Sequence, residues 1–520
     1  MATRIAKGGC LAYSKTLADI SVRSLLRYLA CGLALVALSD VPNNWAAFFL
    51  LAQAILAFLL FLTLLLPIRP AIILLLMLAI AGQDIVSSGN TSLNYSTASI
   101  WQLHVGPLNP SMIVFGVLFW RLFKIRKKTD LPPFVKWLIL WLATVPVIAG
   151  LIYGGFFSGH AGVEVPQDLR FFLMPITTLI LFLSILKRDP RYLTTMLAAF
   201  TGVLVARHFV DLIYVIANVG PVIAEGVSRG STDSAKGGIV FLLFLGLVVV
   251  IIQKRLFLGI LITIPSAFLL VSYGTRNIWI TFVLGIFVLL MFIGVRRSII
   301  FISLGTVLFM GGISSLQMLN PQSAEVVFNR SKDITEGRRA DQFSVLVDYN
   351  ILSRIDQIRY AQILNVFDSA GRRHAYLWGT GYGGYYEDLV AGFPRNLPST
   401  YPQYSLDEGR YFMTHSFSTQ MFLKYGVLGM ILIYALWFIP IYKLFKIWQQ
   451  RSMFTPDQPI ILNSMILCIA AFIPTAMFQT TWSGKGLFIN GLIIAATLEF
   501  SRHYSKSNKC INQRKALCEK

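Results

Sequence analysis

The chain has 520 residues, of which 56% are hydrophobic and only 13% are charged, and its formal net charge is +21 at pH 7. Soluble globular domains contain roughly 25% charged residues, so this composition excludes a soluble globular protein. The excess of Lys and Arg does not indicate nucleic-acid binding. Many of these residues fall at the two ends of the chain and in alternate short connections between apolar runs, and the cytoplasmic segments of membrane proteins are basic in the same way.

Apolar runs long enough to cross a bilayer recur along the chain. A helix needs about 20 apolar residues to span the hydrocarbon, and the continuous runs, without alternation, predict helices rather than a β-barrel. The sequence therefore predicts an all-α polytopic membrane protein with about 14 transmembrane helices. The predicted spans are 25–39, 45–66, 70–86, 109–123, 134–153, 168–186, 193–219, 237–252, 256–274, 277–295, 298–318, 416–442, 459–479 and 486–500.

The basic residues orient these spans. Clusters such as Lys124–Lys128 and Arg296–Arg297 lie in alternate connections, which places both termini on the cytoplasmic side. The chain then divides into N-terminal transmembrane helices (1–220), a second group of transmembrane helices (221–318), a large outer loop (319–415), C-terminal transmembrane helices (416–500) and a basic cytoplasmic tail (501–520).

Four arginines lie at the outer ends of predicted spans, where ionisable groups usually face a cavity or a partner. They are Arg170, Arg229, Arg276 and Arg410. Because arginine is suited to bidentate capture of phosphate oxygens, the set indicates a site for an anionic, lipid-linked substrate such as a pyrophosphate. The alternative for each arginine is that its side chain snorkels to phospholipid head groups.

Two charged residues interrupt the apolar run 193–219. Arg207 and Asp211, with His208 beside them, have the i, i+4 spacing that places the charges on one helix face. This pattern predicts a buried structural ion pair. The alternative is a coupling or proton-relay site of a transporter.

The outer loop 319–415 is far longer than an ordinary connection, which is typical of functional loops. Apolar residues recur at helical spacing over 341–367 and charged residues lie between them. The pattern predicts an amphipathic helix that either lies on the membrane face or packs on the helix bundle. The stretch LWGTGYGGYYE (377–387) follows no βαβ unit, so we expect it to approach the substrate or the bundle closely rather than to bind a nucleotide.

The loop ends at His415, directly before the apolar run 416–442. Histidine titrates near neutral pH, and nearby arginines favour its uncharged form. A neutral imidazole can take a proton from a hydroxyl as a general base. No His or Cys partner lies at metal-ligand spacing, so no metal site is predicted. The simpler interpretation is a polar residue tolerated at the mouth of a helix.

Several stretches resemble the O-antigen ligase and O-antigen polymerase superfamily. HSFSTQMFLKYGVLG (415–429) is similar to its signature, a histidine at the end of a large periplasmic loop followed by an apolar helix with Gly-x-x-Gly. WGTGYGGY (378–385) resembles the glycine-rich run of the family. SYGTRNIWITFVLG (272–285) and SRGSTDSAKGG (228–238) resemble its two arginine segments, in the same order. The residue after the histidine is Ser416, where the family commonly has asparagine.

The resemblance implies a multi-pass glycosyltransferase of the bacterial inner membrane with a GT-C-like helical fold. Such an enzyme works at the periplasmic face without metal or cofactor and with inversion. Its donor would be an undecaprenyl-pyrophosphate-linked glycan and its acceptor another glycan, with a chain-length regulator and a flippase as further partners. His415 would be the general base, and Arg276 and Arg229 would hold the donor pyrophosphate. Arg170 and Arg410 are assigned to the same pyrophosphate site only because they are predicted at the same outer level of the membrane, since no family motif contains them.

The number of predicted spans favours a polymerase, but other functions stay open. A ligase would use the same chemistry to transfer the glycan to lipid A core or to a protein. A flippase or another transporter of lipid-linked oligosaccharide would centre on Arg207 and Asp211. Most ionisable residues lie at one predicted membrane face, however, which favours a transferase. A non-catalytic assembly scaffold would leave His415 without a role.

Overall fold

The computed structural model describes residues 22–43, 45–82, 98–100, 131–186, 192–217, 233–251, 254–272, 295–319, 357–393, 403–414 and 416–449, together with short helical stretches within 113–121, 282–286 and 491–499. The helices are α2 (Val22–Ser39), α3 (Ala46–Leu65), α4 (Ile68–Ala81), α6 (Pro133–Ile152), α7 (Ala161–Leu186), α8 (Tyr192–Ala217), α10 (Asp233–Ile251), α11 (Leu256–Ser272), α13 (Val295–Leu319), α16 (Gln357–Arg372), α17 (Gln403–Glu408) and α18 (Phe417–Gln449), with the 3-10 helix η1 (Gly155–Phe157). Strands β1 (Tyr386–Glu387) and β2 (Arg410–Tyr411) form an antiparallel pair. The described elements are otherwise helical, which confirms the all-α prediction for this part of the chain.

The membrane prediction is confirmed in its coarser form. Within the described residues, five helices are long and apolar enough to cross a bilayer, namely α2, α3, α6, the Thr195–Tyr214 part of α8 and the Phe417–Leu436 part of α18. The other long helices contain shorter apolar segments, such as 176–186 in α7. The predicted span 459–479 lies outside the described residues. The count of 14 spans and the GT-C arrangement remain predictions.

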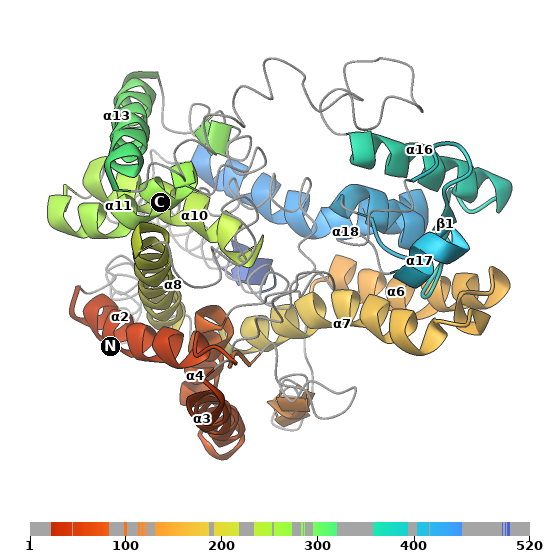
Figure 1. Cartoon of the computed structure of the whole chain (residues 1–520), viewed down its shortest axis with the longest axis horizontal. Coiled ribbons are helices and arrows are strands. Elements are labelled where there is room, and N and C mark those ends of the chain that lie inside the picture. The colour runs from red at the N-terminus through yellow and green to blue at the C-terminus, as the bar shows by residue number, and fades with distance from the viewer. Residues whose placement is uncertain are drawn as a thin grey trace, which may run out of the picture.

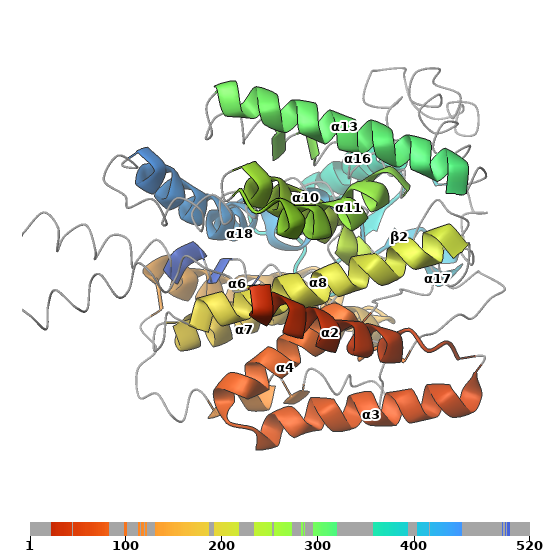
Figure 2. The same ribbon diagram turned by 90° about the vertical axis from the view of Figure 1, so that its left-hand side faces the viewer.

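The helices form two groups (Figure 1). In one group α2, α3, α4, α8, α10, α11 and α13 pack in succession, and Figure 2 shows them as a stack with α13 at one edge and α3 at the other. The second group consists of α6, α7 and α18. At one end of these three helices lie α16, β1, α17 and β2, which together we call the cap (residues 357–393 and 403–414).

Small residues let α2 and α8 approach closely. A Cβ atom added at Gly32 would come within 2.9 Å of the Val203 Cα, and one added at Gly202 within 2.8 Å of the Tyr28 Cβ. Membrane helices without a hydrophobic driving force between them associate through such close backbone packing. The pairing brings the end of α2, and Asp40 directly after it, to the middle of α8.

Helix α18 is interrupted at Gly426, whose φ of 63° and ψ of −171° are not helical. Residues 376–384, which we call the glycine loop, enter this break. The N–H groups of Thr380 and Gly381 donate to the carbonyls of residues 423 and 424 at 2.7 and 3.0 Å. The N–H groups of residues 427 and 428 donate to the carbonyls of Tyr376 and Leu377 at 2.9 and 3.1 Å. In an unbroken helix residues 423 and 424 would accept from 427 and 428, so the loop pairs these four backbone groups in place of the helix.

Helix α6 has a similar gap at Pro146. Proline lacks the N–H that would donate to the Leu142 carbonyl. The Tyr382 hydroxyl donates to that carbonyl at 2.8 Å, and the Tyr382 N–H donates to the Pro146 carbonyl at 3.0 Å. The glycine loop therefore joins α6 to α18 by pairing the backbone groups that both helices leave unsatisfied. The expectation that this loop approaches the bundle closely is confirmed.

The predicted amphipathic helix is present over 357–367, where α16 begins at Gln357 and continues to Arg372. Residues 341–356 lie outside the described part. The helix packs on α18, with the rings of Phe367 and Phe422 stacked at 4.6 Å between centroids. This contact agrees with packing on the bundle, one of the two expected positions.

Candidate functional site

The predicted site residues fall partly outside the described chain. His415, Arg229 and Arg276 are not among the described residues, so their roles remain predictions. Arg170 belongs to α7, one turn beyond Gln167, but its side chain is not described. Arg410 is in β2 and its side chain is exposed.

Hydrogen bonds of Gln420 and Thr414 join the residues that precede and follow position 415. The side chain of Gln420, which is 0% exposed, accepts from the Thr414 N–H at 2.8 Å and donates to the Phe412 carbonyl at 3.1 Å. The Thr414 hydroxyl donates to the Ser416 carbonyl at 2.8 Å, and the Gln420 N–H donates to the same carbonyl at 3.0 Å. Sequence reasoning missed Gln420, although an amide inside an apolar run needs partners of this kind.

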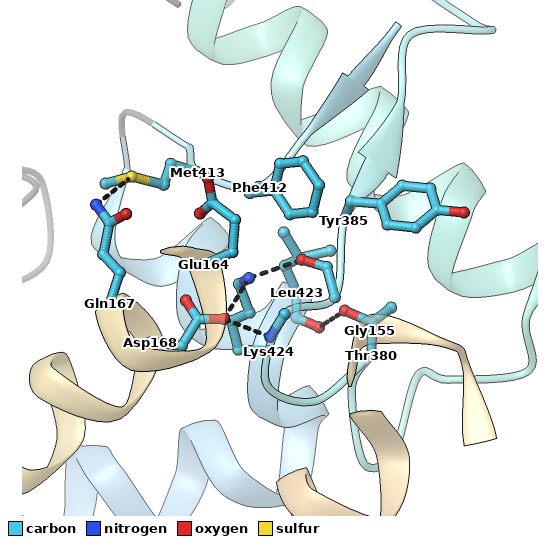
Figure 3. Close-up of polar contacts among 12 residues, drawn as sticks. Gly155, Glu164, Gln167, Asp168, Thr380, Tyr385, Phe412, Met413, Leu423 and Lys424 are labelled. Atoms are coloured by element: carbon cyan, nitrogen blue, oxygen red, sulfur yellow. Dashed lines mark hydrogen bonds and ion pairs between the residues drawn. The ribbon is translucent and has the colours of Figure 1, made fainter. Parts of the chain in front are cut away.

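A buried ion pair fixes the glycine loop between α7 and α18 (Figure 3). Asp168 and Lys424, with side chains 2% and 1% exposed, lie 2.7 Å apart between Oδ2 and Nζ. Asp168 also accepts from the Gly383 N–H at 2.8 Å, and Lys424 donates to the Gly384 carbonyl at 2.7 Å. Each charge thus has a charged partner and a backbone partner, as buried charges require.

Burial raises the pKa of Asp168 to about 6, although Lys424 and the Gly383 N–H both act to lower it. Asp168 lies eight residues before Ile176, where the apolar segment of α7 begins. The structure extends α7 back to Ala161, beyond the predicted start at 168, because polar residues of this first part find partners in the cap. The sequence carried a signal for the pair, since Lys424 interrupts one predicted span and Asp168 begins another.

The first part of α7 meets the cap through a second polar group. His160, just before α7, stacks on Tyr404 with 4.2 Å between ring centroids, and its Nε2 lies 2.9 Å from Glu408 Oε1. The Tyr404 hydroxyl donates to Glu164 at 2.6 Å. Burial raises the pKa of Tyr404, and the bond to Glu164 raises it further, so the phenol stays protonated as a donor. Phe412 also packs against the His160 ring, at 5.9 Å.

Two arginines share one aromatic ring on the cap. The guanidinium carbons of Arg373 and Arg410 lie 4.2 and 5.1 Å from the Tyr385 ring centroid. Arg373 also donates to the Tyr385 carbonyl and approaches Glu387 at 3.8 Å. Arg410 is exposed, and among the described residues no carboxylate lies within ion-pair distance of it. A guanidinium in this position can bind an anionic ligand five residues from His415.

The predicted pair of Arg207 and Asp211 is present, at 2.9 Å between Nε and Oδ1. It has a third member that sequence reasoning missed. Arg207 also donates from its terminal nitrogen to Asp40 at 2.6 Å. The cluster belongs to α8 and the end of α2, which lie in the other group of helices, on the opposite side of the molecule from the cap (Figure 1).

Neither a protein-family model nor a curated protein sequence matches the chain. The interpretation of the site therefore depends on the residues themselves and on their arrangement.

Proposed function

We propose that the chain is a membrane glycosyltransferase that polymerises undecaprenyl-pyrophosphate-linked oligosaccharide units at the periplasmic face. His415 is the general base, and Arg276 and Arg229 hold the donor pyrophosphate. Arg170 and Arg410 add positive charge at the same level of the membrane.

The support for this proposal is the way the backbone around position 415 is fixed. A general base must be held within hydrogen-bond reach of the proton that it takes, and a site held by buried neighbours keeps such a geometry. Gln420 pairs with the backbone of Phe412 and Thr414 on one side of residue 415, and Ser416 accepts two hydrogen bonds on the other side. The described residues that flank position 415 are therefore held by hydrogen bonds to one another and to the first turn of α18.

The chemistry is a single displacement. His415 takes the proton of a sugar hydroxyl on the acceptor as the oxygen attacks the anomeric carbon of the donor. The bond from that carbon to the pyrophosphate oxygen breaks, and the oxygen leaves with the bonding electrons. Positive charge fixed before the reaction stabilises this departing anion without reorganisation. Arg410 lies five residues before the base in β2 and is exposed, so it can contribute to this charge.

The test is the surface glycan of cells that carry His415→Asn in place of the native chain, with membrane levels of the protein measured. His374→Asn is a matched control, because His374 is an exposed histidine of the same loop with a positive φ of 52°, which Asn tolerates. A polymerase whose base is lost yields glycan that stops at one repeat unit, while the control keeps its ladder.

The same experiment separates the other functions. Polymer that forms on the lipid carrier but never reaches its final acceptor identifies a ligase. Repeat units that stay on the cytoplasmic side identify a transporter. A normal ladder from His415→Asn rejects the proposed base and, with it, the mechanism above.

A further inference from the structure

The cluster of Asp40, Arg207 and Asp211 has no part in the proposed transfer reaction, yet its side chains are buried as deeply as those of the Asp168–Lys424 pair. The Arg207 side chain is 0% exposed and both carboxylates are 2% exposed. Arg207 and Asp211 lie within the Thr195–Tyr214 segment, which is long and apolar enough to cross the membrane. Charges in such a position are costly and usually have a function.

The cluster has too few positive charges. One guanidinium faces two carboxyl groups, so two ionised carboxylates would leave one negative charge uncompensated in an apolar interior. A buried ionisable group in that position becomes neutral instead of remaining charged.

The two carboxyl groups of the cluster also lack a hydrogen-bond donor at one oxygen each, among the groups that the structure describes. Arg207 contacts only the Oδ1 atom of each aspartate. Among the described groups, Oδ2 of Asp40, Oδ2 of Asp211 and the hydroxyl of Ser39 are buried without a hydrogen-bond partner. A carboxylate oxygen that lacks a donor is the atom that gains most from a proton of its own.

The neighbouring titratable groups do not supply the missing charge. The Tyr214 side chain forms a hydrogen bond with Asp40, but a phenol is neutral and adds no positive charge. His208 lies 3.0 Å from the Ser266 hydroxyl through Nδ1, and that hydroxyl donates to the Ile262 carbonyl at 3.3 Å. The Ser266 oxygen therefore accepts from Nδ1 of the imidazole in either protonation state. The Nε2 atom is buried and makes no hydrogen bond to the described groups, so a second proton there would be unsatisfied and the imidazole is neutral.

We propose that Asp40, Arg207 and Asp211 form a membrane-buried proton-binding site that holds one proton on its two carboxyl groups at neutral pH. The site joins the end of α2 to the middle of α8. Because it is closed to solvent, the proton exchanges only when α2 and α8 move apart, so protonation and that movement are thermodynamically linked.

The direct measurement is the infrared band of protonated carboxyl groups, recorded on the full chain in lipid nanodiscs. The work is done near pH 8, about two units above the pKa of about 6 of Asp168, so that Asp168 is ionised. The wild type is expected to show one buried protonated carboxyl. Asp40→Asn and Asp211→Asn should each abolish the band, because the remaining carboxylate and Arg207 are then neutral as a pair. His208→Gln and Asp368→Asn, which alters an exposed residue of α16, should retain it.

Thermal stability gives an independent readout. Asn resembles a protonated aspartate, so at least one of the two Asn variants should melt within a few degrees of the wild type. Arg207→Met leaves two carboxyl groups without a cation and should melt far lower.

Three outcomes would overturn the proposal. The first is a wild type without the protonated-carboxyl band, which places any proton elsewhere or leaves both carboxylates ionised. The second is a band that both Asn variants retain, or Asn variants that both fail to fold. The third is a band that disappears when choline chloride is replaced by sodium chloride, which identifies a sodium site.

Discussion

Removal of the Lys424 amine tests whether the cap is fixed to the membrane helices by charge. In Lys424→Met the Asp168 carboxylate remains buried, with its side chain 2% exposed, and loses its cation. Removing one partner of a buried pair costs about 3–5 kcal/mol. The Gly384 carbonyl loses its donor as well. We expect the free energy of unfolding to fall by at least about 3 kcal/mol at neutral pH.

The loss of unfolding free energy in Lys424→Met should depend on pH. Lys424 lowers the pKa of Asp168, so its removal raises this pKa above the value of about 6 that Asp168 has in the native chain. The ordinary value of 3.8 applies to the unfolded chain. The folded variant therefore binds the proton more tightly than its unfolded form, and the stability deficit shrinks as the pH falls through the folded pKa.

The assay is thermal or denaturant unfolding of the purified chain in detergent at stepped pH. Lys443→Met is the matched control, because Lys443 belongs to the same helix but is exposed. The double variant Asp168→Asn/Lys424→Met should recover more than half of the loss, since Asn keeps an acceptor for the Gly383 N–H without a charge. Equal stability of the Lys424 and Lys443 variants, or a double variant no better than Lys424→Met, would refute this reasoning.

Three further predictions concern single side chains. The free energy of unfolding of the wild type, relative to that of Asp168→Asn, should rise by up to about 3 kcal/mol as the pH falls from above 6 to below 3.8. The reason is that the pKa of Asp168 is higher in the folded chain than in the unfolded chain, and parallel unfolding curves at stepped pH check this. Gln420→Met should reduce glycan output by up to about 100-fold at unchanged protein level, because small displacements of a catalytic group are costly; normal output rejects a positioning role. Tyr382→Phe should lose about 1–3 kcal/mol in unfolding experiments because it leaves the buried Leu142 carbonyl unpaired, whereas Tyr385→Phe should change little.

The helices could be predicted because their signal is local. Continuous apolar runs indicate helices wherever they occur, and the ends of α2, α3 and α6 lie within a few residues of the predicted spans. The pairing of Arg207 with Asp211 was predictable for the same reason, since one turn of helix separates them. The contact of Asp40 with Arg207 could not be predicted, because Asp40 precedes Arg207 by 167 positions and nothing local indicates that α2 packs beside α8.

The partners of single polar residues inside apolar runs were the main omission. Lys424 and Gln420 both interrupt the predicted span 416–442, and burial alone requires that each has a partner. The identity of those partners depends on which loops reach the helix. Asp168 and the glycine loop come from parts of the chain separated from Lys424 by 256 and about 40 positions. A sequence pattern can therefore indicate that such a site exists before it can indicate its members.

The glycine loop shows how two local signals combine into a feature that neither one specifies. Pro146 predicts an unpaired carbonyl in α6, and Gly426 permits a break in α18. Backbone groups at membrane depth must be paired, so both gaps require donors and acceptors from another segment. The glycines allow that segment to come close: a Cβ on Gly381 would lie 2.2 Å from the Gly150 nitrogen, and one on Gly379 would lie 2.5 Å from the Tyr425 nitrogen. The glycines are thus required by the contacts of the loop with α6 and α18. The same contacts hold the start of α18, where Gln420 fixes the segment that carries His415.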